Sequence, residues 1–316
     1  MKQQIKAKIA DFNVMMESAE RDKIVYVLGA DSYFGMHMCK HFYEHGYQVV
    51  GCGKKNAVPE ISFCEYQKTD YRHIVIPQKK YAWILFCHDP HAGYKEHITA
   101  LRLLCDNLKT ISGRWRTVYF SSVSVCFNEN GLVKENDLLR PHNQLEMSII
   151  SAENWLHVNA YESEGQIIPY IYRLCDLYGS EFFELDSTGL LNKIVSDAMK
   201  KKRLSLPGLG TWRNRYHICD ACESLIAVME SVIPPNCLNI PGERYNTADI
   251  IFWLSNRLNL EIEMNKGENY GDDYSHYAGD RNVSKAFFSN VVKFSPRYTF
   301  KTWFKSQQKT KLSSVS

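Results

Sequence analysis

The amino-acid sequence predicts an α/β protein built on a doubly wound parallel sheet, followed by a smaller C-terminal lobe. Short apolar runs rich in β-branched residues alternate with longer stretches whose apolar residues recur at helical spacing. This alternation is typical of βαβ units and a parallel sheet. We expect an N-terminal amphipathic helix over residues 1–22, the sheet domain over 23–178, and a substrate-binding lobe over 179–316, interleaved with late elements of the sheet.

The expected strands are apolar and end close to residues that favour turns. The first strand is apolar at most positions and ends at Gly29, as expected of a strand buried on both faces. The predicted strands are Lys23–Leu28, Tyr47–Cys52, Tyr81–Cys87, Thr117–Ser121 and Ile167–Arg173. The predicted helices have apolar faces formed by Phe34, Met38 and Phe42, by Ile98, Leu101, Leu104 and Leu108, and by Leu145, Ile149, Ala152 and Leu156.

Composition excludes several classes of protein. The net charge of +3 is too small to indicate binding to nucleic acid or to a membrane surface. Residues 1–22 lack the apolar block of a signal peptide, and no apolar run approaches the roughly 18 residues of a membrane span. The ten cysteines have no framework spacing, which favours a reducing compartment and free, buried thiols. We therefore expect a cytoplasmic protein with no nucleic-acid or membrane partner.

The turn after the first strand predicts a dinucleotide site of the Rossmann type. Its sequence is Gly29-Ala30-Asp31-Ser32-Tyr33-Phe34-Gly35, in which the first glycine allows a tight turn and the last lets the next helix pack close to the sheet. The helix N-terminus offers N–H groups and positive dipole to phosphates. Ser32 replaces the middle glycine of the usual pattern, and its Cβ crowds the pyrophosphate. Binding is therefore either weakened or lost. The expected cofactor contacts are Gly29, Ser32, Tyr33, Phe34 and Gly35.

The end of the second strand bears on the choice between NAD and NADP. An acidic residue for the ribose hydroxyls of NAD is usual there, but the sequence is Gly51-Cys52-Gly53, followed by Lys54 and Lys55. Lysines at this point suit a 2′-phosphate and favour NADP over NAD, unless they are simply two solvated side chains. Asp70 stands where such folds often contact adenine.

Further segments resemble the extended branch of the short-chain dehydrogenase/reductase superfamily, the NAD(P)-dependent nucleotide-sugar epimerases and dehydratases. These segments occur in the family's order and span roughly residues 23 to 304. They are Val118–Val125, Pro141 with Glu153, Arg173–Gly179, Pro207–Gly210 with Arg213, His217 and Asp220, and Asp280, Ser284 and Lys285 before Phe294-Ser295-Pro296. The resemblance implies a Rossmann-type fold, NAD(P) and hydride transfer on a nucleotide-activated sugar, with surface polysaccharide synthesis as the commonest setting.

The resemblance weakens at the residues that do the chemistry. The family uses a tyrosinate to take a proton, a lysine four residues later to lower its pKa, and a Ser or Thr to hold the substrate oxygen. Alignment on Glu153 places Leu145 and Ile149 at the tyrosine and lysine positions. Ser122 fits the serine position. Asp176 replaces the asparagine that commonly contacts the substrate diphosphate, and its charge would repel that group.

Several residues could replace what is missing. His88, after the third strand, is the candidate acid or base because an unperturbed histidine titrates near neutrality, although an ordinary polar loop is the plainer interpretation. Arg213 matches the family position for gripping a diphosphate, whereas Arg215 is either a second such ligand or a surface charge.

Two further patterns have a structural and a functional interpretation. The histidines at 37, 41 and 45 share one helix face, where we expect a polar surface rather than a metal site because the HExxH context is absent. Cys219 and Cys222 form a CxxC that we expect in a packing helix rather than in a redox pair.

Three functions remain open. The first is an enzyme acting on a nucleotide-activated sugar through a relocated acid or base. The second is a non-catalytic regulatory or assembly subunit that binds a dinucleotide or a nucleotide sugar, and the third is a structural partner that has also lost the cofactor. The expected ligands are NADP or NAD, bound weakly, and a small nucleotide sugar, and a homodimer is one possible assembly.

Overall fold

The computed structural model describes residues 23–69, 74, 81–87, 94–127, 132–182, 189–200, 203–207, 212–265, 282–283 and 285–313. The expected N-terminal helix, Asp70, His88, residues 208–210, Asp280 and Ser284 lie outside these residues. The chain divides into two compact units. The first comprises Met1–Phe120 with Ser148–Ile171, and the second comprises Ser121–Met147 with Tyr172–Ser316.

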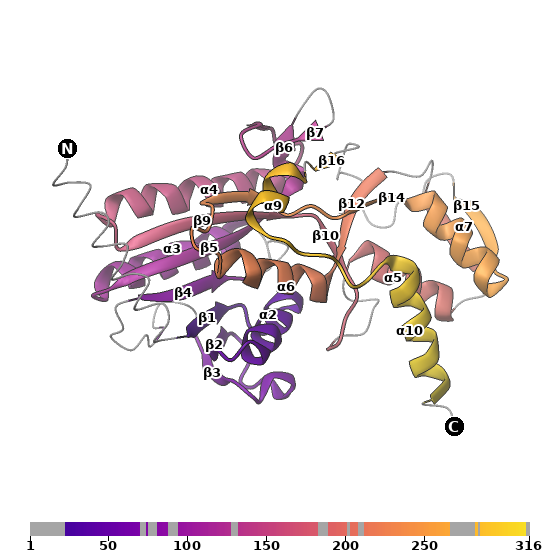
Figure 1. Ribbon diagram of the computed structural model, residues 1–316, viewed down its shortest axis with the longest axis horizontal. Helices are drawn as coiled ribbons and strands as arrows, with labels where there is room; N and C mark the ends of the chain where they lie inside the picture. Colours follow the sequence, from indigo (N-terminus) through magenta and orange to yellow (C-terminus); the bar gives the residue numbers. More distant parts are fainter. Residues whose placement is uncertain are drawn as a thin grey trace. The chain divides into compact units, whose positions relative to one another are not determined.

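A seven-stranded sheet has the strand order β13-β9-β5-β4-β1-β2-β3 (Figure 1). β1 pairs in parallel with β2 and with β4, β2 with β3, and β4 with β5. The predicted α/β class with a parallel sheet is therefore confirmed. The strands are β1 (Ile24–Leu28), β2 (Gln48–Gly53), β3 (Glu65–Lys68), β4 (Tyr81–Phe86), β5 (Arg114–Ser122), β9 (Ile167–Leu174) and β13 (Cys237–Asn239).

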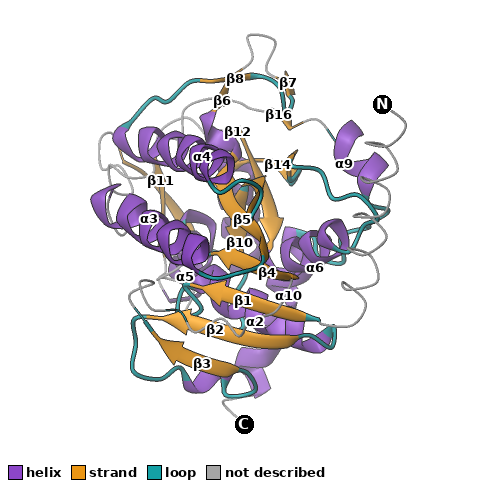
Figure 2. Ribbon diagram, turned by 90° about the vertical axis from the view of Figure 1, so that its left-hand side faces the viewer, coloured by secondary structure: helices purple, strands orange, loops and turns teal. Residues whose placement is uncertain are grey.

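Helices connect these strands in the two directions of a doubly wound sheet. They are α2 (Tyr33–Glu44), α3 (Tyr94–Thr110) and α4 (Gln144–Glu162). From β1 the chain continues to β2 and β3 at one edge of the sheet, and from β4 it continues to β5 and β9 toward the other edge. Since crossover connections are right-handed, α2 lies on one face of the sheet, and α3 and α4 lie on the opposite face. Figure 2 shows α3 and α4 on the same side of β4 and β5. The strand order reverses between β1 and β4, and sheets of this kind bind ligands at the carboxyl ends of such strands.

The second unit contains small sheets and helices. Strands β10, β12 and β14 form a three-stranded sheet, with β10 parallel and β14 antiparallel to β12. β11 pairs in parallel with β15, β7 in parallel with β16, and β6 antiparallel with β8. These strands are β6 (Cys126–Phe127), β7 (Leu132–Val133), β8 (Leu138–Leu139), β10 (Asp176–Tyr178), β11 (Arg203–Pro207), β12 (Trp212–His217), β14 (Glu243–Asn246), β15 (Glu261–Asn265) and β16 (Asn282–Val283).

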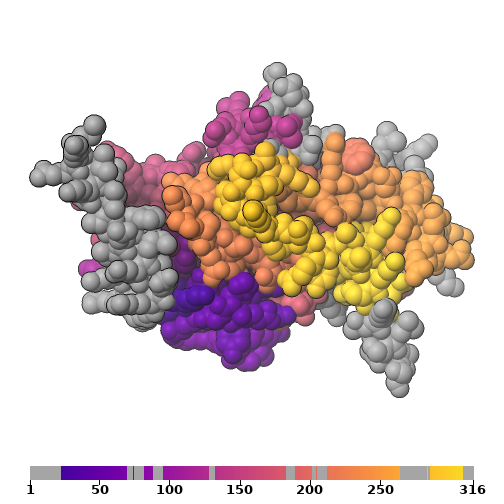
Figure 3. Space-filling model, viewed as in Figure 1, coloured from indigo at the N-terminus to yellow at the C-terminus, as the bar shows by residue number. Residues whose placement is uncertain are grey.

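A hydrophobic cluster holds the late helices of the second unit together. It contains Ile194, Leu254 and Phe304, which are fully buried, and Trp303, which is nearly so. Figure 3 shows residues of α10, in yellow, adjoining those of α7, in orange. The helices of this unit are α5 (Leu190–Lys200), α6 (Ile218–Met229), α7 (Thr247–Leu258), α9 (Ala286–Val291) and α10 (Phe300–Ser313).

The cysteines agree with the expectation from composition. All ten cysteines lie among the described residues, none of them forms a disulfide, and most are buried, as expected. Within the described part of the chain, no helix is both long and apolar enough to span a bilayer.

Candidate functional site

The turn between β1 and α2 has the geometry expected of the first and last glycines of its pattern. Gly29 has a φ of 81°, a conformation that glycine adopts readily, and the amides of Gly29 and Ala30 donate to the Cys52 carbonyl at 2.8 and 3.0 Å. A Cβ added to Gly35 would lie 2.0 Å from the Gly29 carbonyl oxygen. The start of α2 therefore packs so closely on the turn that only glycine fits at position 35.

The Ser32 hydroxyl both accepts and donates a hydrogen bond within the protein. Its Oγ accepts the Gly35 N–H at 3.0 Å, which makes it the N-cap of α2, and donates to the Cys87 carbonyl at the end of β4, also at 3.0 Å. The hydroxyl therefore occupies one of the amides that a phosphate could use. Among the described residues, no acceptor bonds to the Phe34 amide, so the first turn of α2 still offers a donor. The site thus fits a pyrophosphate, with fewer donors than an all-glycine turn.

The two lysines after β2 are both exposed and lie close to carboxylates. The Lys54 ammonium forms an ion pair with Glu96 near the start of α3. The Asp31 carboxylate, from the glycine turn, accepts the backbone N–H groups of Lys54 and Lys55 at 3.0 and 3.1 Å. The Lys54 ammonium is therefore already paired with a carboxylate, whereas Lys55 contacts Asp31 through its backbone.

The first turns of α4 carry the residues aligned with the family's proton-transfer pair. Leu145 is half-buried, and Ile149, one turn later, is only 3% exposed. Glu153, on which the alignment rests, is also buried. Both aligned residues therefore have apolar side chains, and the second is packed into the interior.

Sequence reasoning missed a polar pair at the start of this same helix. Glu146 is completely buried, and its Oε2 accepts the His142 N–H at 2.7 Å and lies 3.1 Å from His142 Nδ1. The Glu146 amide donates to Asn143 Oδ1 at 2.8 Å. Within the described residues, Glu146 Oε1 has no hydrogen-bond partner. The pattern Asn-x-x-Glu before an apolar run is a capping-box signal that could have revealed the pair.

Ser122, expected to hold a substrate oxygen, has a local structural role. Its Oγ accepts the Ser124 N–H at 3.1 Å and donates to Ser124 Oγ at 2.9 Å, capping the short 3-10 helix Val123–Val125. The side chain is half-buried. A substrate oxygen would therefore compete with Ser124 for this hydroxyl.

Strands β10 and β12 bring Asp176 together with two arginines. Arg213 Nη1 lies 3.3 Å from Asp176 Oδ2, and the Arg213 side chain is only 9% exposed whereas that of Asp176 is 38% exposed. Arg215 pairs in register with Asp176 and is 1% exposed, so its interpretation as a surface charge is wrong. It points inward from β12, where its Nη2 donates to Thr247 Oγ1 at 3.0 Å.

Burial also changes the ionisation of Arg215. Loss of solvent lowers the pKa of its guanidinium to about 10, and the nearby Asp176 carboxylate opposes that shift. Its Nη1 has no partner among the described residues. The guanidinium remains charged at neutral pH. Because Arg215 also lies in register with Glu243 of β14, the three strands bring two arginines together with two acidic residues.

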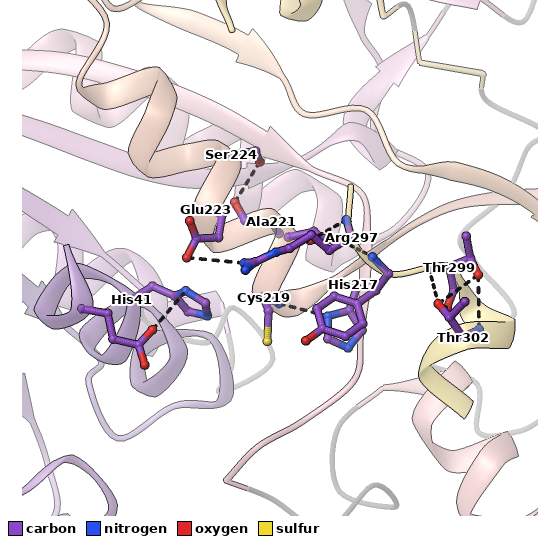
Figure 4. A network of polar contacts seen from close by, with 12 residues as sticks. His41, His217, Cys219, Ala221, Glu223, Ser224, Arg297, Thr299 and Thr302 are labelled. Atoms are coloured by element: carbon purple, nitrogen blue, oxygen red, sulfur yellow. Dashed lines mark hydrogen bonds and ion pairs between the residues drawn. The ribbon is translucent and has the colours of Figure 1, made fainter. Parts of the chain in front are cut away.

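Other residues of the resemblance have structural contacts in the second unit. Gly179 has a φ of 89°, and a Cβ there would lie 2.4 Å from His217 Nε2. The His217 ring stacks on Tyr298 with centroids 4.1 Å apart. The fully buried Asp220 accepts the backbone N–H groups of Arg297 and Tyr298 at 3.1 and 2.8 Å. Figure 4 shows His217 and Arg297 in this network, with Arg297 also paired to Glu223 at 3.6 Å.

The histidine face of α2 differs from expectation. His37 and His41 are buried, at 0% and 4% exposed, so the predicted polar surface face is wrong for these two residues. His37 Nδ1 lies 2.8 Å from the Tyr33 carbonyl oxygen, within the same helix. Cys219 and Cys222 are both buried in α6, the helical packing position expected for them.

The geometry and the motifs define a member of the extended, dinucleotide-binding α/β class. The model of the NAD dependent epimerase/dehydratase family matches residues 25–241, so the chain belongs to this family. Among curated protein sequences, none matches this chain.

Solved structures with the same fold include several nucleotide-sugar enzymes. The NAD-dependent NDP-hexosamine 5,6-dehydratase TunA of tunicamycin biosynthesis is 14% identical, with a TM-score of 0.73 over 90% of this chain and 98% of that chain. MoeE5 in complex with UDP-glucose and NAD is 17% identical, with a TM-score of 0.72 over 92% and 99%. The UDP-glucose 4-epimerase of Thermotoga maritima, with UDP-glucose, is 14% identical, with a TM-score of 0.73 over 93% and 100%.

Proposed function

We propose that this chain binds a nicotinamide dinucleotide at the Gly29–Gly35 turn and a nucleotide-activated sugar in its second unit. The observation that carries the proposal is the turn itself, in which a glycine-tight junction leads from β1 to a helix whose first turn offers an N–H donor. Structural neighbours described as complexes with NAD and UDP-glucose support both ligands. When bound, the dinucleotide would supply the hydride acceptor or donor for chemistry at a sugar carbon.

The Asp176–Arg213 pair is the proposed contact for the diphosphate of the sugar nucleotide. A guanidinium binds phosphate oxygens through paired, charge-assisted hydrogen bonds. Arg213 is largely buried and directed to Asp176, so its donors are fixed in place before a ligand arrives. The carboxylate takes part of the donor capacity of Arg213, which makes this contact weaker than in a relative with asparagine at position 176.

The family's ordinary proton transfer is the step we expect to be missing. A positioned general base contributes roughly 10²- to 10⁴-fold in rate, and the leucine at position 145 cannot exchange a proton. Ile149 cannot hold the nicotinamide ribose as the family lysine does, and it is buried in the interior. This burial favours the second candidate function, a regulatory or assembly subunit that binds its ligands without turning them over.

Two histidines are candidates for a relocated acid or base. His88 follows β4, where the strand order of the sheet reverses, but lies outside the described residues. His142 stands just before α4, where the buried Glu146 carboxylate orients its ring. A histidine held by a carboxylate is a common proton-transfer arrangement. His142 is therefore the candidate that the described structure supports directly.

Turnover and binding should be measured on the same proteins. The assay follows absorbance at 340 nm and product mass on a panel of nucleotide sugars, with the wild type, His88→Ala, His142→Ala and the double variant Leu145→Tyr/Ile149→Lys. Negligible wild-type turnover, with nucleotide-sugar binding that weakens in Arg213→Ala, would support the proposal. Robust wild-type turnover that survives both histidine substitutions would contradict the loss of ordinary proton transfer, and absence of all ligand binding would contradict the proposal as a whole.

Loss of activity in one histidine variant alone would assign the relocated acid or base to that residue. A matched control is available on the second unit's surface. Lys301 is exposed and its ammonium lies 5.9 Å from the centre of the Trp253 ring, so we expect Lys301→Ala to leave ligand binding unchanged.

A further inference from the structure

The carboxyl end of β2 lacks an acidic residue in its own sequence but receives one from elsewhere. Asp31, in the glycine turn, directs its carboxylate to the residues that follow β2. Its Oδ2 accepts the N–H groups of Lys54 and Lys55 at 3.0 and 3.1 Å. The carboxylate is therefore held at the place where this fold usually positions an acid for the adenosine ribose.

The end of β2 is shaped around this carboxylate. A Cβ added to Gly53 would lie 2.5 Å from Asp31 Oδ1 and 2.6 Å from the Tyr66 hydroxyl oxygen. Glycine at position 53 therefore makes room for the carboxylate. Burial, followed by the charge of Asp31, raises the pKa of Tyr66 to about 12, so the tyrosine stays neutral. Its hydroxyl donates to the Lys55 carbonyl and helps to fix the same loop.

Local charge does not favour a 2′-phosphate at this position. The ammonium of Lys54 is paired with Glu96, and Lys55, whose backbone N–H binds Asp31, is exposed. One of the two lysines is thus already paired, and Asp31 places a negative charge directly at the end of β2. A 2′-phosphate would bring further negative charge next to Asp31, whereas two ribose hydroxyls could donate to it.

We propose that Asp31 is the ribose-recognition residue of this chain and that it selects NAD(H) against NADP(H). The inference rests on the proposed dinucleotide site and reverses the preference that the two lysines suggest in the sequence. In this chain the acidic residue belongs to the glycine turn and not to the end of β2. The backbone N–H groups of Lys54 and Lys55 hold its carboxylate at the end of β2. Selection against NADP(H) then comes from repulsion by Asp31, from the loss of hydroxyl contacts, and from the pairing of the Lys54 ammonium with Glu96.

The test is calorimetric titration of the full chain with NADH and with NADPH. Wild type should bind NADH at least roughly tenfold more tightly, the scale of one charge-assisted hydrogen bond. Asp31→Asn keeps an oxygen acceptor for the Lys54 and Lys55 amides but removes the charge. This substitution should weaken NADH binding and strengthen NADPH binding. The preference for NADH over NADPH should therefore become smaller or reverse.

A second variant keeps the test decisive if Asp31→Asn folds poorly. Glu96→Gln leaves Asp31 in place and releases the Lys54 ammonium, so NADPH binding should improve while NADH binding stays within about twofold. Preference for NADPH by wild type, or an unchanged NADH-to-NADPH ratio in both variants, would overturn the assignment while leaving the dinucleotide site intact. If wild type binds neither cofactor, both the assignment and the proposed function fail.

Discussion

Replacing Ser32 separates two effects of the serine that occupies the middle position of the glycine turn. We expect its Cβ to crowd a pyrophosphate, and its hydroxyl binds the Gly35 amide. Ser32→Gly removes both obstacles, whereas Ser32→Ala frees the amide but keeps the Cβ. The backbone at this residue, with φ −88° and ψ 163°, is extended and suits either replacement without strain. The two variants therefore differ mainly in the space left for the ligand.

The stability cost follows from the bonds that are lost. Ser32→Ala removes an N-cap, which costs about 0.5–2 kcal/mol, and the bond to the Cys87 carbonyl, which contributes about 0.5–1.5 kcal/mol. We expect Ser32→Ala to lower the free energy of unfolding by about 1–3 kcal/mol. Ser32→Gly should cost less, about 1 kcal/mol, because glycine is itself an acceptable N-cap.

The affinity for NADH should rise in both Ser32 variants, although their stability falls. A freed Gly35 amide could make one more charge-assisted hydrogen bond to a phosphate, so Ser32→Gly should bind NADH on the order of tenfold more tightly than wild type. Ser32→Ala should gain less because its Cβ remains. Calorimetry gives the affinities and urea denaturation gives the stabilities.

A control variant separates stability from affinity. Asn246→Ala removes a comparable N-cap from α7, in the second unit, and should lower stability without changing NADH affinity. If Ser32→Gly and Ser32→Ala both bind NADH as wild type does, the reasoning about this serine is refuted.

Three further substitutions test other parts of the structure. Gly35→Ala should lower stability by about 1–3 kcal/mol and abolish dinucleotide binding, because the added Cβ would meet the Gly29 carbonyl; wild-type binding would contradict this. Asp176→Asn should tighten UDP-glucose binding several-fold in calorimetry while lowering the melting temperature, and weaker binding would argue against a diphosphate contact. Glu146→Ala should lower the free energy of unfolding by about 1–3 kcal/mol in urea because it leaves the His142 amide unpaired. Glu162→Ala, at the exposed end of the same helix, should cost less than about 0.5 kcal/mol, and equal losses would contradict the capping role of Glu146.

The main elements of the sheet could be predicted because buried parallel strands leave a continuous apolar signal. β1 is buried at every residue, and its predicted span differs from the observed one only at Lys23. β3 gives no such signal, because Glu65-Tyr66-Gln67-Lys68 is a short edge strand that pairs with β2 on one side and is partly exposed. β13 is likewise only Cys237–Asn239, too short for periodicity to identify.

The contacts of the candidate site could be predicted only in part, because their partners are distant in the sequence. Residue types at the glycine turn indicated a phosphate site, but the bond from Ser32 to Cys87 joins residues 55 positions apart. The pairing of Lys54 with Glu96 spans 42 positions, and it involves one of the two lysines on which the expected preference for NADP rests. Local sequence shows which groups are present, whereas their charge balance depends on which strands and helices the fold brings together.

The effect of Asp176 on ligand affinity and on stability can be understood only together with Arg215. Taken alone, a carboxylate at position 176 repels a diphosphate. In the three-stranded sheet, however, Asp176 lies in register with a buried guanidinium and within 3.3 Å of a second, on Arg213. A buried cation without a nearby anion is strongly unfavourable, so the carboxylate stabilises Arg215 in a way that a neutral asparagine could not. Glu243 of β14 lies in register with Arg215 on its other side, so two acidic residues balance the two arginines, and loss of the Asp176 charge would leave a positive excess that attracts a diphosphate. Asp176→Asn should therefore gain affinity at the expense of stability, whereas a second change of Arg215 to an apolar residue should restore the stability.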